Sequence, residues 1–408
     1  MKILWHSVSP FIGSGYGKVT RYVTRGLAEL GHKVIISAYY GVEPGGLLTF
    51  QGIPILASKE GPFGVISAAK FARLYRSDIQ ILHTDWWAFS KFPELMSYPV
   101  LYGPMDHVFY PEEIIDFTKK YKRLISLSKW QRDELKSRWG LDSDVIYHGV
   151  DLSIYKPMNK EEVKRELKVE DKFVFGTVAA NNDKEDRKFH SGMIKAMYWF
   201  LQENPDVKDV VWLYHSDPVS PRGMPLSRIV HKWGLDEIVK FKDPNLVYTG
   251  ISEQEMAKLY NAMDVHLLCS KREGFGMPIL ESMACKVPNI VHEFSAPKEL
   301  VKGRGWIVKS LTKDLNLQTT PINAETAIPD VYDLAEKIKR AYFRKKERER
   351  YAKLSRNFAI KFDWRMLLLE KWEPILREIE EDLKYSSGRS SILIQEQMEE
   401  FLRQKQQS

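Results

Sequence analysis

The chain has 408 residues, enough for two domains, because a single domain usually has roughly 100–200 residues. Hydrophobic residues make up 44% and charged residues 28%, which excludes general disorder. A net charge of +7 over this length does not indicate a dedicated nucleic-acid binder. It fits a protein that handles anionic ligands or contacts an anionic membrane surface.

The cysteine content and the lengths of the hydrophobic runs indicate the cellular compartment of the protein. The two cysteines, Cys269 and Cys285, are too few for a disulfide framework and favour a reducing environment. The apolar run that starts at Met1 is too short for a signal peptide. No stretch reaches the ~18 apolar residues that a membrane span needs. We therefore expect a cytoplasmic protein, and peripheral contact with the inner face of a membrane stays open.

Short apolar runs alternate with helical periodicity in the first part of the chain. A helix is expected at Lys18–Leu30, where Gly31 ends it. The expected strands are Lys2–Val8, Lys33–Tyr39, Ile53–Ala57, Ile79–His83, Val100–Gly103, Arg123–Leu127 and Asp144–Tyr147. Apolar strands separated by amphipathic helices predict a parallel sheet that is covered on both faces.

The same pattern begins again after a turn at His148–Asp151. The second set of expected strands is Phe173–Ala179, Val210–His215, Leu246–Thr249, Asp264–Cys269, Asn289–His292 and Gly305–Val308. We expect an α/β protein with two doubly wound, Rossmann-like domains, residues 1–152 and 153–362, that face each other across a cleft. A C-terminal helix at about 363–384 is expected to pack back on the first domain, and residues 385–408 form a polar tail.

One segment, residues 270–288, carries most of the chemical information. It contains, in order, Glu273, Gly274, Gly276, Pro278 and Glu281. The glycines let backbone amides approach a ligand, and the proline suits the start of a helix. The second acid is then expected in the first helical turn. A helix amino end suits a diphosphate, and the two carboxylates can accept hydrogen bonds from sugar hydroxyls. A capping box at Ser270 is disfavoured, because the glycines and the proline would interrupt its helix.

This segment resembles the Glu-x7-Glu signature of retaining glycosyltransferases of family four, which have the GT-B fold. The match from Glu273 to Cys285 is nearly complete, and Lys286 replaces the usual small residue after it. The resemblance implies that Glu273 contacts the transferred sugar and that Glu281 binds the ribose hydroxyls. It also implies that the backbone along the sugar and phosphates comes from Gly274, Phe275, Gly276, Met277 and Pro278.

A basic pair, Arg187 and Lys188, follows the first strand of the second half. Basic side chains at this place are expected to point into the cleft and to neutralise a leaving diphosphate. The resembling family has an Arg and a Lys a few residues apart here, so the adjacent pair departs from its pattern. A solvated, charged turn stays open as the alternative.

Two further groups complete the expected site. The resemblance implies that the loop with Gly15, Tyr16 and Gly17, between the first strand and the first helix, approaches the donor phosphates and the acceptor. A plain tight turn is the alternative. Asp106 and His107 follow another strand at the cleft end. A histidine titrates near neutral pH and can bond a sugar hydroxyl or the acceptor.

Neither a metal nor a cofactor is expected. The sequence Asp142-Ser143-Asp144 spells a DxD motif, but its place before a strand favours a turn. The cysteines and histidines lack metal-site spacing. The stretch Val65–Arg76 is amphipathic and basic, which is compatible with an anionic lipid surface. Packing on a sheet is the commoner use of such a helix.

The sequence therefore predicts a retaining, metal-independent glycosyltransferase. Its expected donor is a nucleotide-diphosphate-sugar, and its acceptor is a hydroxyl of a saccharide, a lipid-linked or a small molecule. Two alternatives stay open: a catalytically inactive GT-B protein that binds sugars or nucleotides, and a nucleotide-sugar epimerase on the same fold. No nucleic-acid partner is expected, because no basic-aromatic motif occurs.

Overall fold

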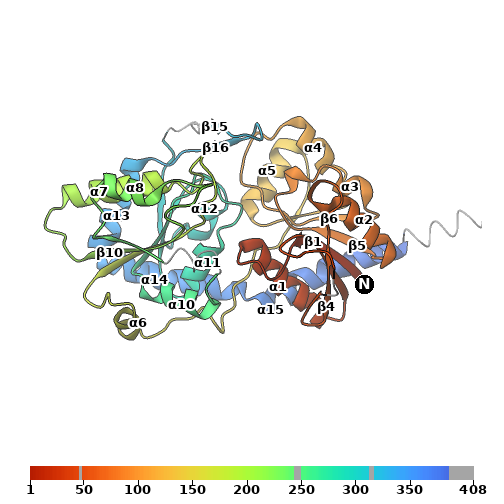
Figure 1. The fold of residues 1–408 in the computed structure, drawn as a ribbon, viewed down its shortest axis with the longest axis horizontal. Coiled ribbons are helices and arrows are strands. Elements are labelled where there is room, and N and C mark those ends of the chain that lie inside the picture. Colours follow the sequence, from red (N-terminus) through yellow and green to blue (C-terminus); the bar gives the residue numbers. More distant parts are fainter. Residues whose placement is uncertain (46–47, 243–249, 312–316, 386–408) are drawn as a thin grey trace, which may run out of the picture.

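The computed structural model describes residues 1–45, 48–242, 250–311 and 317–385. They form two α/β lobes that lie side by side (Figure 1). The first lobe surrounds an eight-stranded sheet and the second lobe a six-stranded one, which confirms the expected fold class. The expected strand Leu246–Thr249 and all but the first residue of the tail 385–408 lie outside the described residues. None of the described helices combines the length and apolarity that a membrane span requires.

The sheet of the first lobe has the order β3-β4-β2-β1-β5-β6-β7-β8. All neighbouring strands are parallel except β3 and β4. The strands are β1 Lys2–Val8, β2 Lys33–Tyr40, β3 Leu48–Phe50, β4 Ile53–Ala57, β5 Ile79–Leu82, β6 Pro99–Leu101, β7 Arg123–Ser126 and β8 Asp144–Val145. Sequence patterning missed β3, because three residues at a sheet edge are too few to show an alternation.

Helices cover both faces of this sheet. They are α1 Gly15–Glu29, α2 Val65–Leu74, α3 Phe92–Leu95, α4 Glu112–Thr118, α5 Lys129–Trp139 and the short η1 Pro62–Gly64 and η2 Trp86–Ala88. Trp5 of β1 packs in one core with Val19 of α1, whereas its neighbour Leu4 packs in another with Val65 of α2. Successive strand residues point to opposite faces, so burial on both faces explains the continuous apolar runs.

The sheet of the second lobe has the order β11-β10-β9-β12-β13-β14 and is parallel throughout. Its strands are β9 Phe173–Val178, β10 Val210–His215, β11 Val239–Phe241, β12 Val265–Leu268, β13 Asn289–His292 and β14 Trp306–Val308. Its helices are α6 Lys160–Glu166, α7 His190–Glu203, α8 Leu226–Lys232, α10 Glu253–Ala262, α11 Met277–Ala284, α12 Ala296–Val301, α13 Val331–Phe343 and α14 Lys345–Ala359. The hairpin of β15 Leu317–Thr319 and β16 Glu325–Ala327 bridges to Val108 of the first lobe (Figure 1).

Each sheet has a place where its strand order changes direction. In the first lobe this place lies between β1 and β5, and in the second lobe between β9 and β12. The loops at the carboxyl ends of such strands diverge and leave a crevice, which is where ligands bind in open α/β sheets. The segments that the sequence analysis selects follow β1, β6, β9 and β12.

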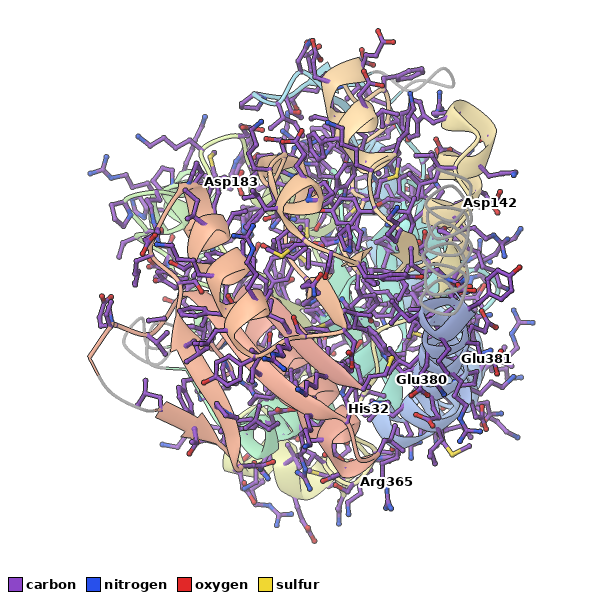
Figure 2. All side chains as sticks on the ribbon, turned by 90° about the vertical axis from the view of Figure 1, so that its right-hand side faces the viewer. His32, Asp142, Asp183, Arg365, Glu380 and Glu381 are labelled. Carbon is purple, nitrogen blue, oxygen red and sulfur yellow. The ribbon has the colours of Figure 1, made fainter. Side chains whose placement is uncertain are left out.

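The chain passes between the lobes at Val150 and Asp363, which pair with each other. The second passage leads through η3 Ile360–Phe362 into α15 Trp364–Leu367, a π-helical turn η4 Leu368–Trp372 and helical residues 373–385. This stretch, blue in Figure 1, runs along the first lobe. In Figure 2 that lobe faces the viewer, with Glu380 and Glu381 labelled on the C-terminal helix.

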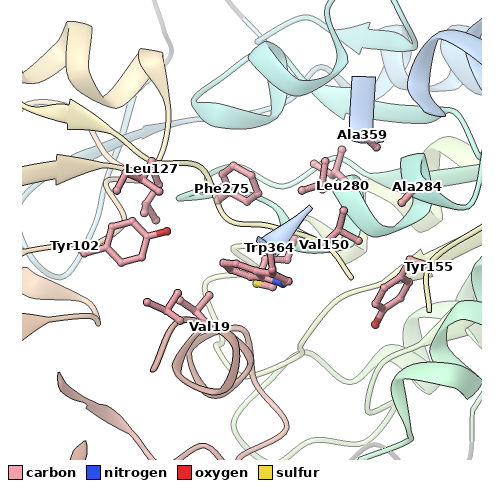
Figure 3. Packing of buried hydrophobic residues seen from close by; sticks show 14 of the residues in the cluster. Val19, Tyr102, Leu127, Val150, Tyr155, Phe275, Leu280, Ala284, Ala359 and Trp364 are labelled. Carbon is pink, nitrogen blue, oxygen red and sulfur yellow. The ribbon is translucent and has the colours of Figure 1, made fainter. Parts of the chain in front are cut away.

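Aromatic packing attaches the C-terminal stretch to the first lobe. Trp364 stacks on Tyr22 of α1 with ring centroids 5.3 Å apart, and Trp372 lies 6.0 Å from Trp5. Figure 3 shows Trp364 between α1 and the Phe275 segment of the second lobe. One buried hydrophobic cluster therefore continues from one lobe into the other.

Helix α1 begins earlier than its sequence pattern predicts. Ser14 is its N-cap, and the amide of Gly17 donates to the Ser14 hydroxyl at 3.1 Å. The glycine loop is therefore the first turn of α1 rather than a free loop. A Cβ on Gly17 would lie 2.1 Å from the carbonyl oxygen of Ile12, so only glycine allows this close approach.

The substitution Gly17→Ala is expected to lower the free energy of unfolding by about 3 kcal/mol, because the clashing atom belongs to the backbone. The matched control is Gly13→Ala, whose added Cβ has its nearest neighbour 4.0 Å away. Urea denaturation of both variants measures the difference. Equal midpoints for the two would contradict the close approach at Gly17.

Candidate active site

A buried ion cluster surrounds Glu273 on the loop after β12. One carboxylate oxygen of Glu273 accepts a hydrogen bond from Ser270 Oγ at 2.8 Å and contacts the ammonium of Lys188. The other lies 3.9 Å from Nη1 of Arg187. Burial opposes the charge, but Lys188 and Arg187 outweigh it and hold the pKa of Glu273 below its usual value. Three of the four residues that the sequence predicts as catalytic, all except His107, therefore meet here.

The loop after β9 brings the two basic side chains to this point. Asp186 has a left-handed φ of 56° and accepts hydrogen bonds from the amides of His190 and Ser191 at 2.7 and 3.0 Å. It thereby caps the start of α7 and directs the next two residues, Arg187 and Lys188, toward β12. The carbonyl of Arg187 also accepts from the amide of Lys271 at 2.9 Å. A backbone hydrogen bond thus connects the loop after β9 to the loop after β12 at this switch point.

The first lobe contributes Asp106 and His107, which follow β6. Asp106 Oδ1 lies 2.6 Å from His107 Nδ1, and its Oδ2 lies 3.7 Å from Nε of Arg272 in the second lobe. Burial raises the pKa of Asp106, but His107, Arg272 and Arg187 together lower it to about 2. Asp106 is therefore a permanent negative charge that faces the basic loop of the other lobe.

A second carboxyl group, Asp85, follows β5 beside Asp106. It accepts a hydrogen bond from the hydroxyl of Tyr16 at 2.6 Å. Burial, and then the charge of Asp106, raise the pKa of Asp85. The side chain of the predicted residue Tyr16 thus reaches the carboxyl group that follows β5. Its place at the end of a strand makes Asp85 a possible acceptor contact on sequence grounds too, although it is not among the predicted site residues.

Arg272 is a further cleft residue that the sequence analysis missed. Its Nη2 lies 3.3 Å from Glu185 Oε2. Its Nε and Nη1 are buried and find no hydrogen-bond acceptor among the described residues, and Nε2 of His107 is buried without a hydrogen-bond partner there. Buried donors without partners are costly in a free protein, so a ligand rich in oxygen atoms would satisfy them.

Glu281 lies in the second turn of α11, not in the first turn as the sequence predicts. It is the fifth residue after the N-cap Gly276, and a turn has only about 3.6 residues. Both its oxygens have partners. Nζ of Lys18, from α1 of the first lobe, lies 2.5 Å from Oε1, and the hydroxyl of Tyr260 donates to Oε2 at 2.9 Å. Lys18 also donates to the hydroxyl of Tyr155 at 2.9 Å.

The glycine-rich part of the motif packs closely against the first lobe. A Cβ on Gly274 would lie 2.2 Å from Cβ of Pro104, so the backbones meet there. The side chain of Phe275 is buried in the shared core, with its ring centroid 5.0 Å from that of His148 (Figure 3). Phe275 therefore offers only its backbone to a ligand.

The amino end of α11 faces the amino end of α1. Gly276 is the N-cap of α11 with φ 94°, Pro278 follows in the first turn, and no side chain caps the helix. A Cβ on Gly15 would lie 3.6 Å from Sδ of Met277. The free amides at the start of α11 are available for an anion at this edge of the crevice.

The DxD aspartates lie in ion pairs away from this cluster. Asp144 on β8 is 2.5 Å from Arg123 Nε, and Asp142 is 2.7 Å from Lys136 Nζ. Across the ranges that the structure describes, no group of three or more His, Cys, Asp or Glu side chains is placed to hold a metal ion.

Two family models match the chain. Residues 13–154 match "Glycosyltransferase Family 4" and residues 188–318 match "Glycosyl transferases group 1", together about two thirds of the chain. The chain belongs to the glycosyltransferases of family four. In this family-four glycosyltransferase the first model covers the Tyr16, Asp85 and Asp106 side of the crevice, and the second covers Lys188, Glu273 and Glu281.

Curated relatives and solved structures resemble this family-four glycosyltransferase at low identity. A D-inositol 3-phosphate glycosyltransferase of Streptomyces bingchenggensis is 24% identical over 179 residues, 42% of this chain and 38% of that protein. The chain thus matches about two fifths of the length of such relatives. Sucrose-phosphate synthase of Thermosynechococcus elongatus has a TM-score of 0.73 and 17% identity, with 94% of this chain and 100% of that chain covered. Anabaena HepE, solved with UDP and glucose, has a TM-score of 0.68 and 16% identity, covering 92% and 100%. These structures confirm the GT-B fold.

Proposed function

We propose that this glycosyltransferase moves a sugar from a nucleoside-diphosphate sugar to a hydroxyl acceptor, with retention of the anomeric configuration and without a metal ion. The observation that carries the proposal is the buried cluster of Glu273, Lys188 and Arg187 at the switch point of the second sheet. The solved complexes of HepE with UDP and with UDP-glucose support a nucleotide-sugar donor.

The second lobe would bind the donor. Lys188 and Arg187 would neutralise the diphosphate as the bond from the sugar C1 to the phosphate oxygen breaks, the task that a metal ion performs elsewhere. Glu273 would orient the sugar hydroxyls, and Glu281 would accept hydrogen bonds from the ribose. The free amides at the start of α11 would face the diphosphate.

The first lobe would hold the acceptor near Asp106, His107 and Asp85. The acceptor oxygen would form its bond to C1 on the face that the diphosphate leaves, and its proton would pass to the departing phosphate oxygen. This route needs no pair of carboxylates set as nucleophile and acid, unlike glycoside hydrolysis. The close packing of the lobes around the crevice would exclude water as a competing nucleophile.

Two measurements test the proposal. Calorimetry measures the binding of UDP, GDP and ADP. The protein is then incubated with the matching nucleotide-glucose, and NMR identifies the product. Binding of at least one diphosphate, a product with the anomeric configuration of the donor and full activity in EDTA are expected. Failure to bind any of the three diphosphates would contradict the proposal, and an inverted product would contradict retention. A changed sugar formed without an acceptor would instead favour the epimerase alternative.

A further inference from the structure

The outer face of α2 combines exposed apolar side chains with basic ones. Its inner residues, among them Val65 and Ala68, pack under the sheet. On the other side Ile66 and Leu74 are 44% and 75% exposed, and Tyr75 follows directly at 37%. Leu95 of α3, at 36%, borders the same face. A single exposed leucine is ordinary, but several neighbours on one face indicate a contact surface.

A cavity of about 390 Å³ opens beside this face, lined by Arg73, Arg76, Ser77 and Ser97 together with apolar residues that include Leu95. Ser77 and Ser97 form the polar floor of the cavity. The buried Gln80 holds both in place, because it donates to Ser77 Oγ at 3.0 Å and to Ser97 Oγ at 3.1 Å. The two arginine side chains are exposed at its rim.

The charges around the cavity leave its two arginines unneutralised. Asp78, the acid nearest in sequence, accepts a hydrogen bond from the amide of Lys2 at 2.6 Å. Glu60 is paired with Lys70 at 2.5 Å, and Glu94 is paired with Lys91 and Lys120. The guanidinium groups of Arg73 and Arg76 make no ion pair or side-chain hydrogen bond with a described residue. The hydroxyls of Ser77 and Ser97 already donate to Ala72 O and Gln80 Oε1, so the two free guanidinium groups are the donors that match the oxygens of a phosphate group.

We propose that this surface, formed by Ile66, Arg73, Leu74, Arg76 and Leu95, docks the protein on an anionic membrane. The phosphate of a lipid headgroup enters the cavity between Arg73 and Arg76, while the exposed apolar side chains insert among the upper acyl carbons. A free phosphate would use the arginines but would leave the apolar rim in water. A lipid uses both, because headgroup phosphate and acyl chains are joined in one molecule.

Sedimentation of the full chain with lipid vesicles tests the inference. We expect binding to phosphatidylcholine vesicles that contain one third phosphatidylglycerol, and none to phosphatidylcholine alone. Arg73→Gln with Arg76→Gln should lower partitioning roughly twenty-five-fold, since each basic side chain near an anionic surface contributes about five-fold. Leu74→Ser should lower it roughly ten-fold, because a buried apolar contact is lost.

Matched controls remove the same groups from the exposed helix α14. Lys345→Gln with Lys346→Gln removes two charges, and Leu354→Ser removes a leucine that is 39% exposed. Both should bind vesicles as the wild type does. Wild-type binding by the double arginine variant, or no vesicle binding by the wild type, would overturn the inference. So would complete release by inorganic phosphate at the concentration of the lipid phosphate. Vesicle binding needs no sugar donor or acceptor. A negative result in the vesicle experiment therefore leaves the proposed transfer reaction untouched, and the reverse also holds.

Discussion

The substitution Lys188→Met is expected to slow sugar transfer by roughly 10²–10³-fold, the usual cost of losing one group that stabilises charge in the transition state. Lys188 contacts the Glu273 carboxylate in a buried setting, and Arg187 is the nearest other cation, 3.9 Å from that carboxylate. A diphosphate that leaves beside Glu273 would lose its principal counter-charge. Steady-state kinetics with saturating donor measures the effect, which should lie in kcat rather than KM.

Stability measurements separate this role from simple packing. Lys188→Met also leaves Glu273 as a poorly paired buried charge, which should cost about 3 kcal/mol of unfolding free energy. Adding Glu273→Gln removes that charge, so the double variant should regain most of the stability but none of the rate. Lys184→Met, an exposed lysine of the same loop, is the matched control. Recovery of both activity and stability in the double variant would contradict the roles proposed for Lys188 and for Glu273.

The substitution Lys18→Met is expected to tighten binding of a nucleoside diphosphate about ten-fold, a typical coupling between two competing contacts. In the free protein Lys18 and Tyr260 occupy both oxygens of Glu281, the carboxylate proposed to receive the ribose. Ribose hydroxyls must displace the Lys18 ammonium from Glu281. Removing the ammonium therefore destabilises the nucleotide-free protein more than the nucleotide complex. Calorimetry with the diphosphate that binds the wild type measures the change.

Further variants define this competition. Glu281→Gln should weaken binding by roughly the same factor, and adding Lys18→Met to it should change nothing more, because the competing pair is already broken. Arg25→Met on the same helix, which removes the exposed pair with Glu29, should bind as the wild type does. Weaker binding by Lys18→Met would mean that the ammonium itself contacts the nucleotide, contrary to the exchange described here.

Local sequence patterns were enough to predict the layered fold and the residues around Glu273. Apolar runs located β9, β12 and β13 to within a residue or two, since strands buried on both faces have few polar interruptions. Glycine and proline around Gly276 correctly placed Glu273 on a loop and the start of α11 after it. The place of Arg187 and Lys188 after a strand predicted that they reach the cleft, but not that they contact Glu273.

Local sequence patterns could not predict the contacts between the two lobes. Lys18 and Glu281 are 263 residues apart, and nothing local relates the two. Arg272 stands beside Glu273 in sequence, yet a loop has no fixed period that says which way its side chain turns. Glu281 was placed in the first turn of α11, but the helix begins at Met277, one residue before the proline that marked its expected start, so Glu281 falls in the second turn.

The place of the C-terminal helix has a consequence for synthesis on the ribosome. Trp372 completes the packing around Trp5, and Glu373 lies 3.2 Å from His32, 341 residues earlier in the chain. The strands of the first lobe are made before the second lobe, but this part of their core is missing until Trp372 and Glu373 have followed. The lobe that is translated first is therefore the last to be completed, and until then part of its aromatic core lacks the partner that covers it.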